Sequence, residues 1–171
     1  MEEIVVEGGA PLHGAIGVLG AKNAVLKEMA ASLLAAGRHT ITNVPQILDV
    51  DFMAQMLGHT GCHVGRDGHE LHVVVADELR PEAPLELVRQ MRASIVVLGP
   101  LLARCGEARV ALPGGDDLGA RPIDMHLESF EQMGATFELV HGVLVGKVDG
   151  RLRGTEVELP FPSVGATENV L

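Results

Sequence analysis

The sequence predicts an α/β fold built from a repeated unit, and two observations support this prediction. Short runs rich in Val and Ile alternate with longer runs rich in Ala, Leu and Met, a pattern that favours strands alternating with helices. The order of these runs recurs after about 70 residues, which indicates an internal repeat. The 171 residues are 47% hydrophobic but only 2% aromatic, so the chain can bury a core made mainly of aliphatic side chains.

The first copy of the unit follows two short strand-like runs, residues 4–6 and 15–18, which glycines and Pro11 interrupt. Its predicted elements are a buried helix that Gly37 ends, a strand, a second helix capped by Asp49 or Asp51, and the second strand of a hairpin that turns at 66–68. These elements cover residues 23–36, 39–42, 49–57 and 71–75.

The second copy repeats this order, and a third begins at the end of the chain. The second copy is predicted to contain a long apolar helix over residues 87–104, a strand over 108–112 and a helix over 124–134 that Asp124 caps. A hairpin that turns at 141–142 follows. Gly165-Ala166-x-x-x-Val170-Leu171 then repeats Gly20-Ala21-x-x-x-Val25-Leu26. Thr167-Glu168 signals a helix start, but the chain ends before one turn closes. We therefore expect a truncated chain with an incomplete third repeat.

The composition argues against several classes of protein. The 23 acidic and 13 basic residues give a net charge of −10, which argues against nucleic acid as a partner but permits a local phosphate site. No apolar run approaches the ~18 residues of a membrane span, and the acidic N-terminus does not indicate a secretory signal. Cys62 and Cys105 are too few for a disulfide scaffold and favour a reducing, cytoplasmic location.

The most unusual segment is the glycine-rich stretch 112–126, between a predicted strand and a predicted helix. Its glycines let the backbone approach a ligand, Asp116 and Asp117 could donate a proton, and Arg121 could bind a phosphate or carboxylate. Pro122 stiffens the entry to a helix whose N-terminus favours anions. The alternative is a solvated connector whose charges serve solubility.

Other candidates are cationic or metal-ligating side chains. Gly20-Ala21-Lys22-Asn23 places a cation at a helix start, where it opposes the helix dipole, so a bound anion would explain it; an ordinary surface lysine is the alternative. Arg92 lies in an apolar run, where a buried guanidinium needs a partner unless it reaches the surface. The histidines around Cys62 fall across a helix end and a hairpin, so we predict no metal site.

A series of motifs spans the chain from end to end. They are Asn43-Val44-Pro45, Asp49-Val50-Asp51, Met91-Arg92-Ala93-Ser94, Leu98-Gly99-Pro100-Leu101, Leu112-Pro113-Gly114-Gly115, Gly119-Ala120-Arg121-Pro122 and Phe161-Pro162-Ser163-Val164-Gly165-Ala166-Thr167-Glu168-Asn169, beside the Lys22 motif and Val5-x-x-Gly8. Taken in this order, they resemble the UDP-N-acetylglucosamine enolpyruvyl transferase (UDP-N-acetylglucosamine 1-carboxyvinyltransferase) family.

The resemblance implies an inside-out α/β barrel built of repeated βαβαββ-type units. In the family, two domains of three units each enclose the active site between them, and the enzyme is more than twice the length of this chain. Residues 22–171 are therefore expected to form a truncated N-terminal domain. Residues 1–21 are expected to pack with the missing C-terminal domain.

The resemblance also implies a reaction that needs neither a cofactor nor a metal. The enolpyruvyl group of phosphoenolpyruvate would be transferred to the 3-hydroxyl of UDP-N-acetylglucosamine, the first committed step of peptidoglycan synthesis. Carried over by position, Lys22 and Arg121 would hold the phosphate and carboxylate of phosphoenolpyruvate. The UDP-sugar would be contacted by Asn23, Arg92, Arg121, Pro122, Ile123, Asp124, Met125, His126, Ser163, Val164 and Gly165.

One position departs from the family pattern. Asp116 stands where the family usually has the cysteine that acts as general acid and reacts with the epoxide antibiotic fosfomycin; aspartate is a natural variant there. An ordinary aspartate has a pKa of about 3.9, so a proton donor needs a raised pKa. Asp117 and the bound phosphate would raise it, whereas Arg121 would lower it. Because a carboxylate is a poor nucleophile toward an epoxide, fosfomycin resistance is expected.

Two alternatives stay open from the sequence. The acceptor could be another uridine nucleotide or shikimate phosphate, although the run 121–126 favours a uridine ligand. The chain could also be a non-catalytic fragment that weakly binds a nucleotide or a partner chain. The general base lies outside this chain in the family, so these residues alone are not expected to turn over.

Overall fold

The computed structural model describes residues 3–9, 11–111 and 123–171. The first unit consists of α1 (Lys22–Ser32), β1 (Gly37–Ile41), α2 (Leu48–His59), β2 (His63–Asp67) and β3 (Glu70–Val75). The second consists of β4 (Glu82–Ala83), α3 (Leu85–Val88), the 3₁₀ helix η1 (Arg92–Val97), α4 (Leu98–Cys105), β5 (Glu107–Ala111), α5 (Asp124–Gln132), β6 (Ala135–Val140) and β7 (Val143–Val148). The helix α6 (Val164–Val170) follows.

The two units have the same sheet topology, which confirms the predicted repeat. In the first unit the strand order is β1-β3-β2, and in the second β5-β7-β6, with every one of these pairs antiparallel. The short strand β4 pairs in parallel with β5 and extends the second sheet. The second unit thus follows a βαβαββ order.

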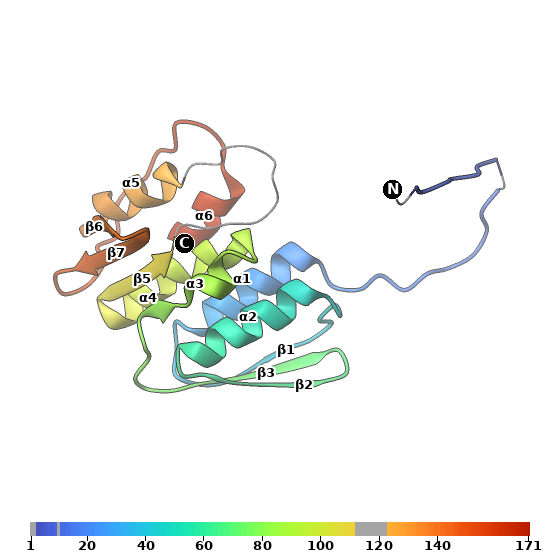
Figure 1. Ribbon diagram of the computed structural model, residues 1–171, viewed down its shortest axis with the longest axis horizontal. Helices are drawn as coiled ribbons and strands as arrows, with labels where there is room; N and C mark the ends of the chain where they lie inside the picture. The colour runs from blue at the N-terminus through green and yellow to red at the C-terminus, as the bar shows by residue number, and fades with distance from the viewer. Residues whose placement is uncertain (1–2, 10, 112–122) are drawn as a thin grey trace.

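The helices α1 to α4 lie between the two sheets, α5 and α6 lie above β6 and β7 in the view of Figure 1, and the core is aliphatic as the composition predicts. In β3, the buried Leu71, Val73 and Val75 alternate with exposed or half-buried positions, because successive side chains of a strand point to opposite faces. The strand β3 contacts α1, and the neighbouring strand β2 contacts α2. In the second sheet, α4 and α5 pack against β5, β6 and β7. Each sheet therefore buries one face against helices.

The hairpin between β6 and β7 turns where the sequence predicts. His141 and Gly142 have φ angles of 51° and 81°, and two consecutive left-handed residues make the turn whose twist matches the flanking strands. In the first unit, Gly68 takes the positive φ angle of 56° between β2 and β3. The turns of both hairpins are thus close to the predicted positions.

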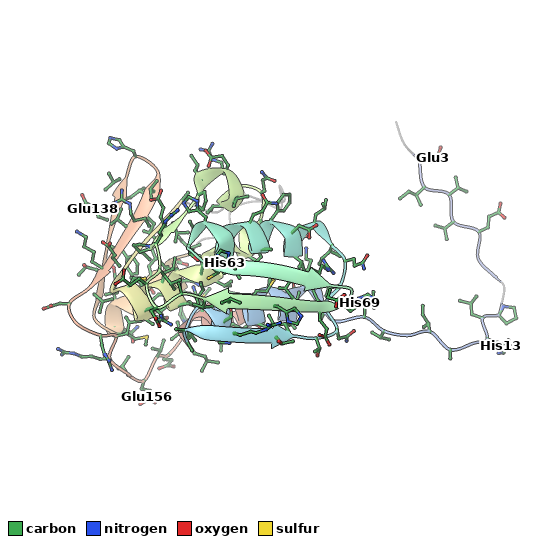
Figure 2. All side chains as sticks on the ribbon, turned by 90° about the horizontal axis from the view of Figure 1, so that it is seen from below. Glu3, His13, His63, His69, Glu138 and Glu156 are labelled. Carbon is green, nitrogen blue, oxygen red and sulfur yellow. The ribbon has the colours of Figure 1, made fainter. Side chains whose placement is uncertain are left out.

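The two strands predicted before the first helix are not formed. Residues 3–9 and 11–19, which we call the N-terminal arm, adopt no regular structure, and Ile4, Val6 and Ile16 are between 84% and 91% exposed. Figure 2 shows Glu3 and His13 on the arm, well away from the folded body. A strand needs a neighbouring strand to accept its hydrogen bonds, and within the described residues none pairs with the arm.

The predicted long helix over 87–104 is wrong, because the chain breaks it into α3, η1 and α4. Met91 is extended, with φ −144° and ψ 117°, and interrupts the helix there. Pro100 lacks an N–H group and is accommodated in the first turn of α4, where that group needs no helical partner. A continuous helix through Pro100 would lose a hydrogen bond and bring its ring against the preceding turn.

The predicted helix starts are also shifted at three places. Ile47 and Ile123, not the nearby aspartates, are the N-cap residues of α2 and α5, so Asp49 and Asp124 lie in the first turns. The last helix begins at Val164, before the predicted Thr167 start, because the Ser163 hydroxyl oxygen accepts a hydrogen bond from the Ala166 N–H group at 3.3 Å. Among the described residues, every helix is too short or too polar to cross a bilayer.

Candidate functional site

Lys22 is the first residue of α1 and has an acidic partner on the next helix. No side chain caps α1, and its first turn has no acidic residue. The Lys22 Nζ atom lies 3.2 Å from Oδ1 of Asp49, in the first turn of α2. The two side chains are 54% and 32% exposed, so solvent reaches both groups. The adjacent residue Asn23 is exposed. The ammonium group is thus held at a helix start but stays open to a ligand.

The helices α1, α2 and α5 run in a similar direction. In Figure 1, each of these helices has its first residue at its right-hand end. The first N–H groups of a helix are unpaired and carry partial positive charge. The start of α1 therefore favours a negatively charged group near Lys22.

His126 lies in the first turn of α5 and is buried. Its Nδ1 atom is 3.0 Å from the side-chain nitrogen Nδ2 of Asn169 in α6. The neighbouring predicted residues differ in exposure: Asp124 is exposed and accepts a hydrogen bond from the Met125 N–H group at 2.9 Å, whereas Ile123 and Met125 are half-buried. This segment thus combines an exposed carboxylate with a buried imidazole.

Ser163, Val164 and Gly165 form the start of α6, and the structure brings this segment to His126. Ser163 caps the helix, and Val164 is 72% exposed. Gly165 lies against the imidazole, since a Cβ atom at this glycine would be 3.6 Å from Nε2 of His126. The predicted contacts in 123–126 and 163–165 are therefore neighbours, and α5 packs on α6.

Other predicted residues cannot be placed. Asp116, Arg121 and Pro122 lie outside the described residues. Arg92 begins η1, but its side chain is not among those described. The backbone of η1 contacts both α1 and α6, so Arg92 belongs to an element between the Lys22 helix and the Ser163 helix.

Two residues that the sequence reasoning missed partner the predicted ones: Asp49 for Lys22 and Asn169 for His126. Asn169 gave one usable signal, because a polar residue placed three positions after the small residue Ala166 falls on the same face of the helix as that buried residue. Asp49 offered only its position at a predicted helix start, and this position does not indicate that Lys22 is its partner.

The histidines and cysteines do not assemble into a metal site. Within the described ranges, no group of three His, Cys, Asp or Glu side chains could hold a metal ion. Figure 2 shows His63, at the start of β2, well apart from His69, in the turn that joins β2 to β3. Burial raises the pKa of the Cys62 thiol, although the Thr60 hydroxyl and the Arg104 charge act against this, and burial also raises that of Cys105. Neither thiol is therefore an activated nucleophile.

Two hollows of about 450 and 440 Å³ flank α6. The first is lined mainly by residues after β7, and the second by α1, α4 and α6. Their walls are mainly apolar and contain none of the predicted site residues, so we do not assign either of them to the candidate site.

Comparison with known proteins identifies the class. Residues 6–171 match the family described as EPSP synthase (3-phosphoshikimate 1-carboxyvinyltransferase), and the chain belongs to this family. The solved enolpyruvyl transferase NikO from Streptomyces tendae superposes with a TM-score of 0.71 at 26% identity, over 85% of this chain and 32% of that one. An EPSP synthase from Acinetobacter baumannii, with TM-score 0.71 and 19% identity over 92% of this chain and 37% of that one, shares the fold.

The more similar relatives carry one name. The UDP-N-acetylglucosamine 1-carboxyvinyltransferases of Mycolicibacterium paratuberculosis and Corynebacterium efficiens are 54% and 53% identical over 170 residues, or 99% of this chain. That of Halalkalibacterium halodurans is 52% identical over the whole chain. This confirms the resemblance found in the sequence. The chain spans about 40% of the length of these relatives.

Proposed function

We propose that the protein to which this chain belongs transfers the enolpyruvyl group of phosphoenolpyruvate to the 3-hydroxyl of UDP-N-acetylglucosamine in the cytoplasm. The observation that carries the proposal is the identity of 52–54% along the whole chain to relatives named for this activity. The exposed Lys22 ammonium at the start of α1 supports an anionic substrate. The product would enter peptidoglycan synthesis.

We assign the chain to the first part of an inside-out barrel. Residues 22–171 would form two βαβαββ-type units and the start of a third, and residues 1–21 would pack with a second domain. The exposed apolar side chains of the N-terminal arm support this assignment, because Ile4, Val6 and Ile16 are 84–91% exposed and lie outside the core that the described residues form. The second domain would supply the general base and further ligands of phosphoenolpyruvate.

The chemistry divides into addition and elimination. The 3-hydroxyl oxygen attacks C2 of the enol while an acid protonates C3, which gives a tetrahedral ketal that still carries phosphate. Loss of the C3 proton and departure of phosphate then form the enol ether. Lys22 and Arg121 would neutralise the phosphate and carboxylate, and Asp116 would be the acid. Asp116 and Arg121 lie outside the described residues, so their roles follow from the motif alone.

The UDP-sugar would bind along the helix starts. We assign to it the predicted contacts Asn23, Arg92, Arg121, Pro122, Ile123, Asp124, Met125, His126, Ser163, Val164 and Gly165. The contact between His126 and Gly165 supports a common surface for two of these segments.

A phosphate-release assay on the complete enzyme tests the acceptor. With phosphoenolpyruvate present, UDP-N-acetylglucosamine should release phosphate and shikimate 3-phosphate should not. Release with a different uridine nucleotide only would replace the proposed acceptor. Calorimetric titration of the present chain with UDP-N-acetylglucosamine separates a binding fragment from one that does not bind.

The acid role of Asp116 is tested by two substitutions. Asp116→Asn should abolish turnover, because an amide cannot donate the proton to C3. Asp116→Cys should keep turnover and make the enzyme sensitive to fosfomycin, to which the unsubstituted enzyme should be resistant. Full activity of Asp116→Asn would show that another group is the acid.

A further inference from the structure

The side-chain amide of Asn169 is buried where three segments meet, and it is only 6% exposed. Its oxygen Oδ1 accepts a hydrogen bond from the Gly99 N–H group at 3.2 Å, and its nitrogen Nδ2 donates to the Ile95 carbonyl oxygen at 3.2 Å. Both partners are backbone groups with fixed donor and acceptor roles. The amide orientation is therefore determined. A flip would place the Nδ2 donor against the Gly99 N–H donor, and the Oδ1 acceptor against the Ile95 carbonyl acceptor.

The second proton of Nδ2 faces His126. Because Nδ2 is a donor and lies 3.0 Å from Nδ1 of His126, this ring nitrogen must accept the hydrogen bond. In a neutral imidazole the proton is then on Nε2. That nitrogen is the one beside Gly165, at the start of α6. The backbone of η1 and α4 thus sets the tautomer of His126 through a single amide.

The close approach of these groups depends on Gly99. A Cβ atom at this position would lie 2.9 Å from Oδ1 of Asn169 and 2.9 Å from Cζ of Phe130 in α5. Such distances leave no room for a side chain, so a glycine is needed where α4 meets both α6 and α5. The absence of a side chain at Gly99 therefore makes room for the Asn169 amide. It also lets α4 approach α5 and α6, the two helices that carry predicted UDP-sugar contacts.

We propose that Asn169 is a positioning residue that holds His126 as its Nε2-protonated tautomer and joins the starts of α5 and α6 into one surface for the nucleotide sugar. The proposal deepens the proposed function and rests on it for the identity of the ligand. Asn169 itself is buried and acts through His126 and through the backbone. The imidazole then carries its N–H group at Nε2, on the side of Gly165.

The substitution Asn169→Asp tests the hydrogen bond with little change in shape. One carboxylate oxygen can still accept from Gly99, but the other replaces the donor that faced His126 and Ile95. The proton of His126 should therefore move to Nδ1, or both ring nitrogens should be protonated. Asn169→Ala, which removes the donor altogether, should leave a mixture of tautomers. Thr167→Ala is the control: this exposed residue of α6 donates only to the Ser163 carbonyl oxygen, at 2.8 Å, among the contacts described.

The measurements are the ring ¹⁵N chemical shifts of His126 in the complete enzyme and steady-state kinetics. We expect a protonated Nε2 in the unsubstituted enzyme and in Thr167→Ala. In Asn169→Asp, KM for UDP-N-acetylglucosamine should rise about tenfold or more, as for a lost charged or buried hydrogen bond, while KM for phosphoenolpyruvate changes less than about threefold. Circular dichroism should show that each variant is folded.

Three results would overturn the proposal. The first is a protonated Nδ1 in the unsubstituted enzyme. The second is an unchanged tautomer in both Asn169 variants. The third is a changed tautomer with an unchanged KM for the acceptor. If the enzyme does not use UDP-N-acetylglucosamine, the proposed function is wrong, but the positioning role of Asn169 is still open to test. The same KM measurements are then made with the acceptor that the enzyme does use.

Discussion

Lys22 and Asp49 form an ion pair between the first turns of two neighbouring helices, with 3.2 Å between Nζ and Oδ1. A cation at the start of α1 is unfavourable for the helix dipole, and the Asp49 carboxylate offsets this. Both side chains are partly exposed, so the pair contributes little to folding, typically below about 1 kcal/mol. The role of the ion pair is better explained by its effect on Lys22, because the pair keeps the ammonium group at the start of α1.

Lys22→Met should therefore separate binding from stability. We expect the unfolding free energy to change by less than about 1 kcal/mol, because the lost pair is exposed. In the complete enzyme, KM for phosphoenolpyruvate should rise about tenfold or more, since a charged contact to phosphate is lost. Urea unfolding and initial rates measure the two effects.

Lys27→Met is the matched control for this change. Lys27 also lies on α1, but its Nζ atom is 2.8 Å from Oε2 of Glu168 on α6. Its loss should weaken the packing of α6 by about 0.5–1 kcal/mol and leave KM for phosphoenolpyruvate unchanged. Equal effects of the two substitutions on that KM would contradict a specific role for Lys22.

Gly99→Ala should destabilise the fold by about 1–3 kcal/mol, because a methyl group there overlaps Asn169 and Phe130. Gly58→Ala is the comparison. Gly58 lies within α2, and no atom lies within 4 Å of the position that its Cβ would take. Alanine favours helices over glycine by about 1 kcal/mol, so this second change should stabilise the chain. The midpoints of guanidinium unfolding should be lower for Gly99→Ala and higher for Gly58→Ala. An unchanged stability of Gly99→Ala would contradict the described packing.

The substitutions at Ser163 distinguish helix capping from ligand binding. Ser163→Ala removes the acceptor for the Ala166 N–H group and should cost about 1 kcal/mol of stability. Ser163→Asp keeps an N-cap and should restore that stability. The added negative charge should nevertheless weaken binding of UDP-N-acetylglucosamine, as calorimetry would show. Unchanged affinity in Ser163→Asp would mean that the ligand does not approach this residue.

The buried thiol of Cys62 and the half-buried thiol of Cys105 predict a loss of stability at alkaline pH. Burial raises the pKa of Cys62 and Cys105 in the folded chain, so the folded state keeps protons that the unfolded chain loses. Their contribution is fully present below the ordinary thiol pKa of about 8.5 and falls as pH rises above it. Urea unfolding at pH 7.5 and 9.5 should show a smaller decrease in Cys62→Ala than in the unsubstituted chain. An equal decrease would assign the pH dependence to other groups.

Local sequence signals were sufficient for most of the fold. Glycines such as Gly37 and Gly142 take positive φ angles near the predicted boundaries, and the alternation in β3 follows from a sheet with one buried face. The break at Met91 was missed because an apolar run does not reveal an extended residue inside it. The N-terminal arm was wrongly predicted to contain strands, since an apolar pattern cannot say whether a pairing partner is present.

The site was harder to predict because its contacts join distant segments. Lys22 could be singled out by its conflict with the helix dipole, but its partner Asp49 depends on how α1 packs on α2. His126 was found through the motif, whereas Asn169 acquires its role from backbone groups of η1 and α4 that only the folded chain brings together. Polar side chains with long-range backbone partners leave no periodic pattern in a sequence.

The exposed outer faces of the two sheets have a practical consequence. Residues such as Thr40 on β1 and Glu138 on β6 are exposed, and the helices with the candidate site lie on the other side of each sheet (Figures 1 and 2). A fluorophore or spin label attached at either position would report on movements between the units without entering the chemistry.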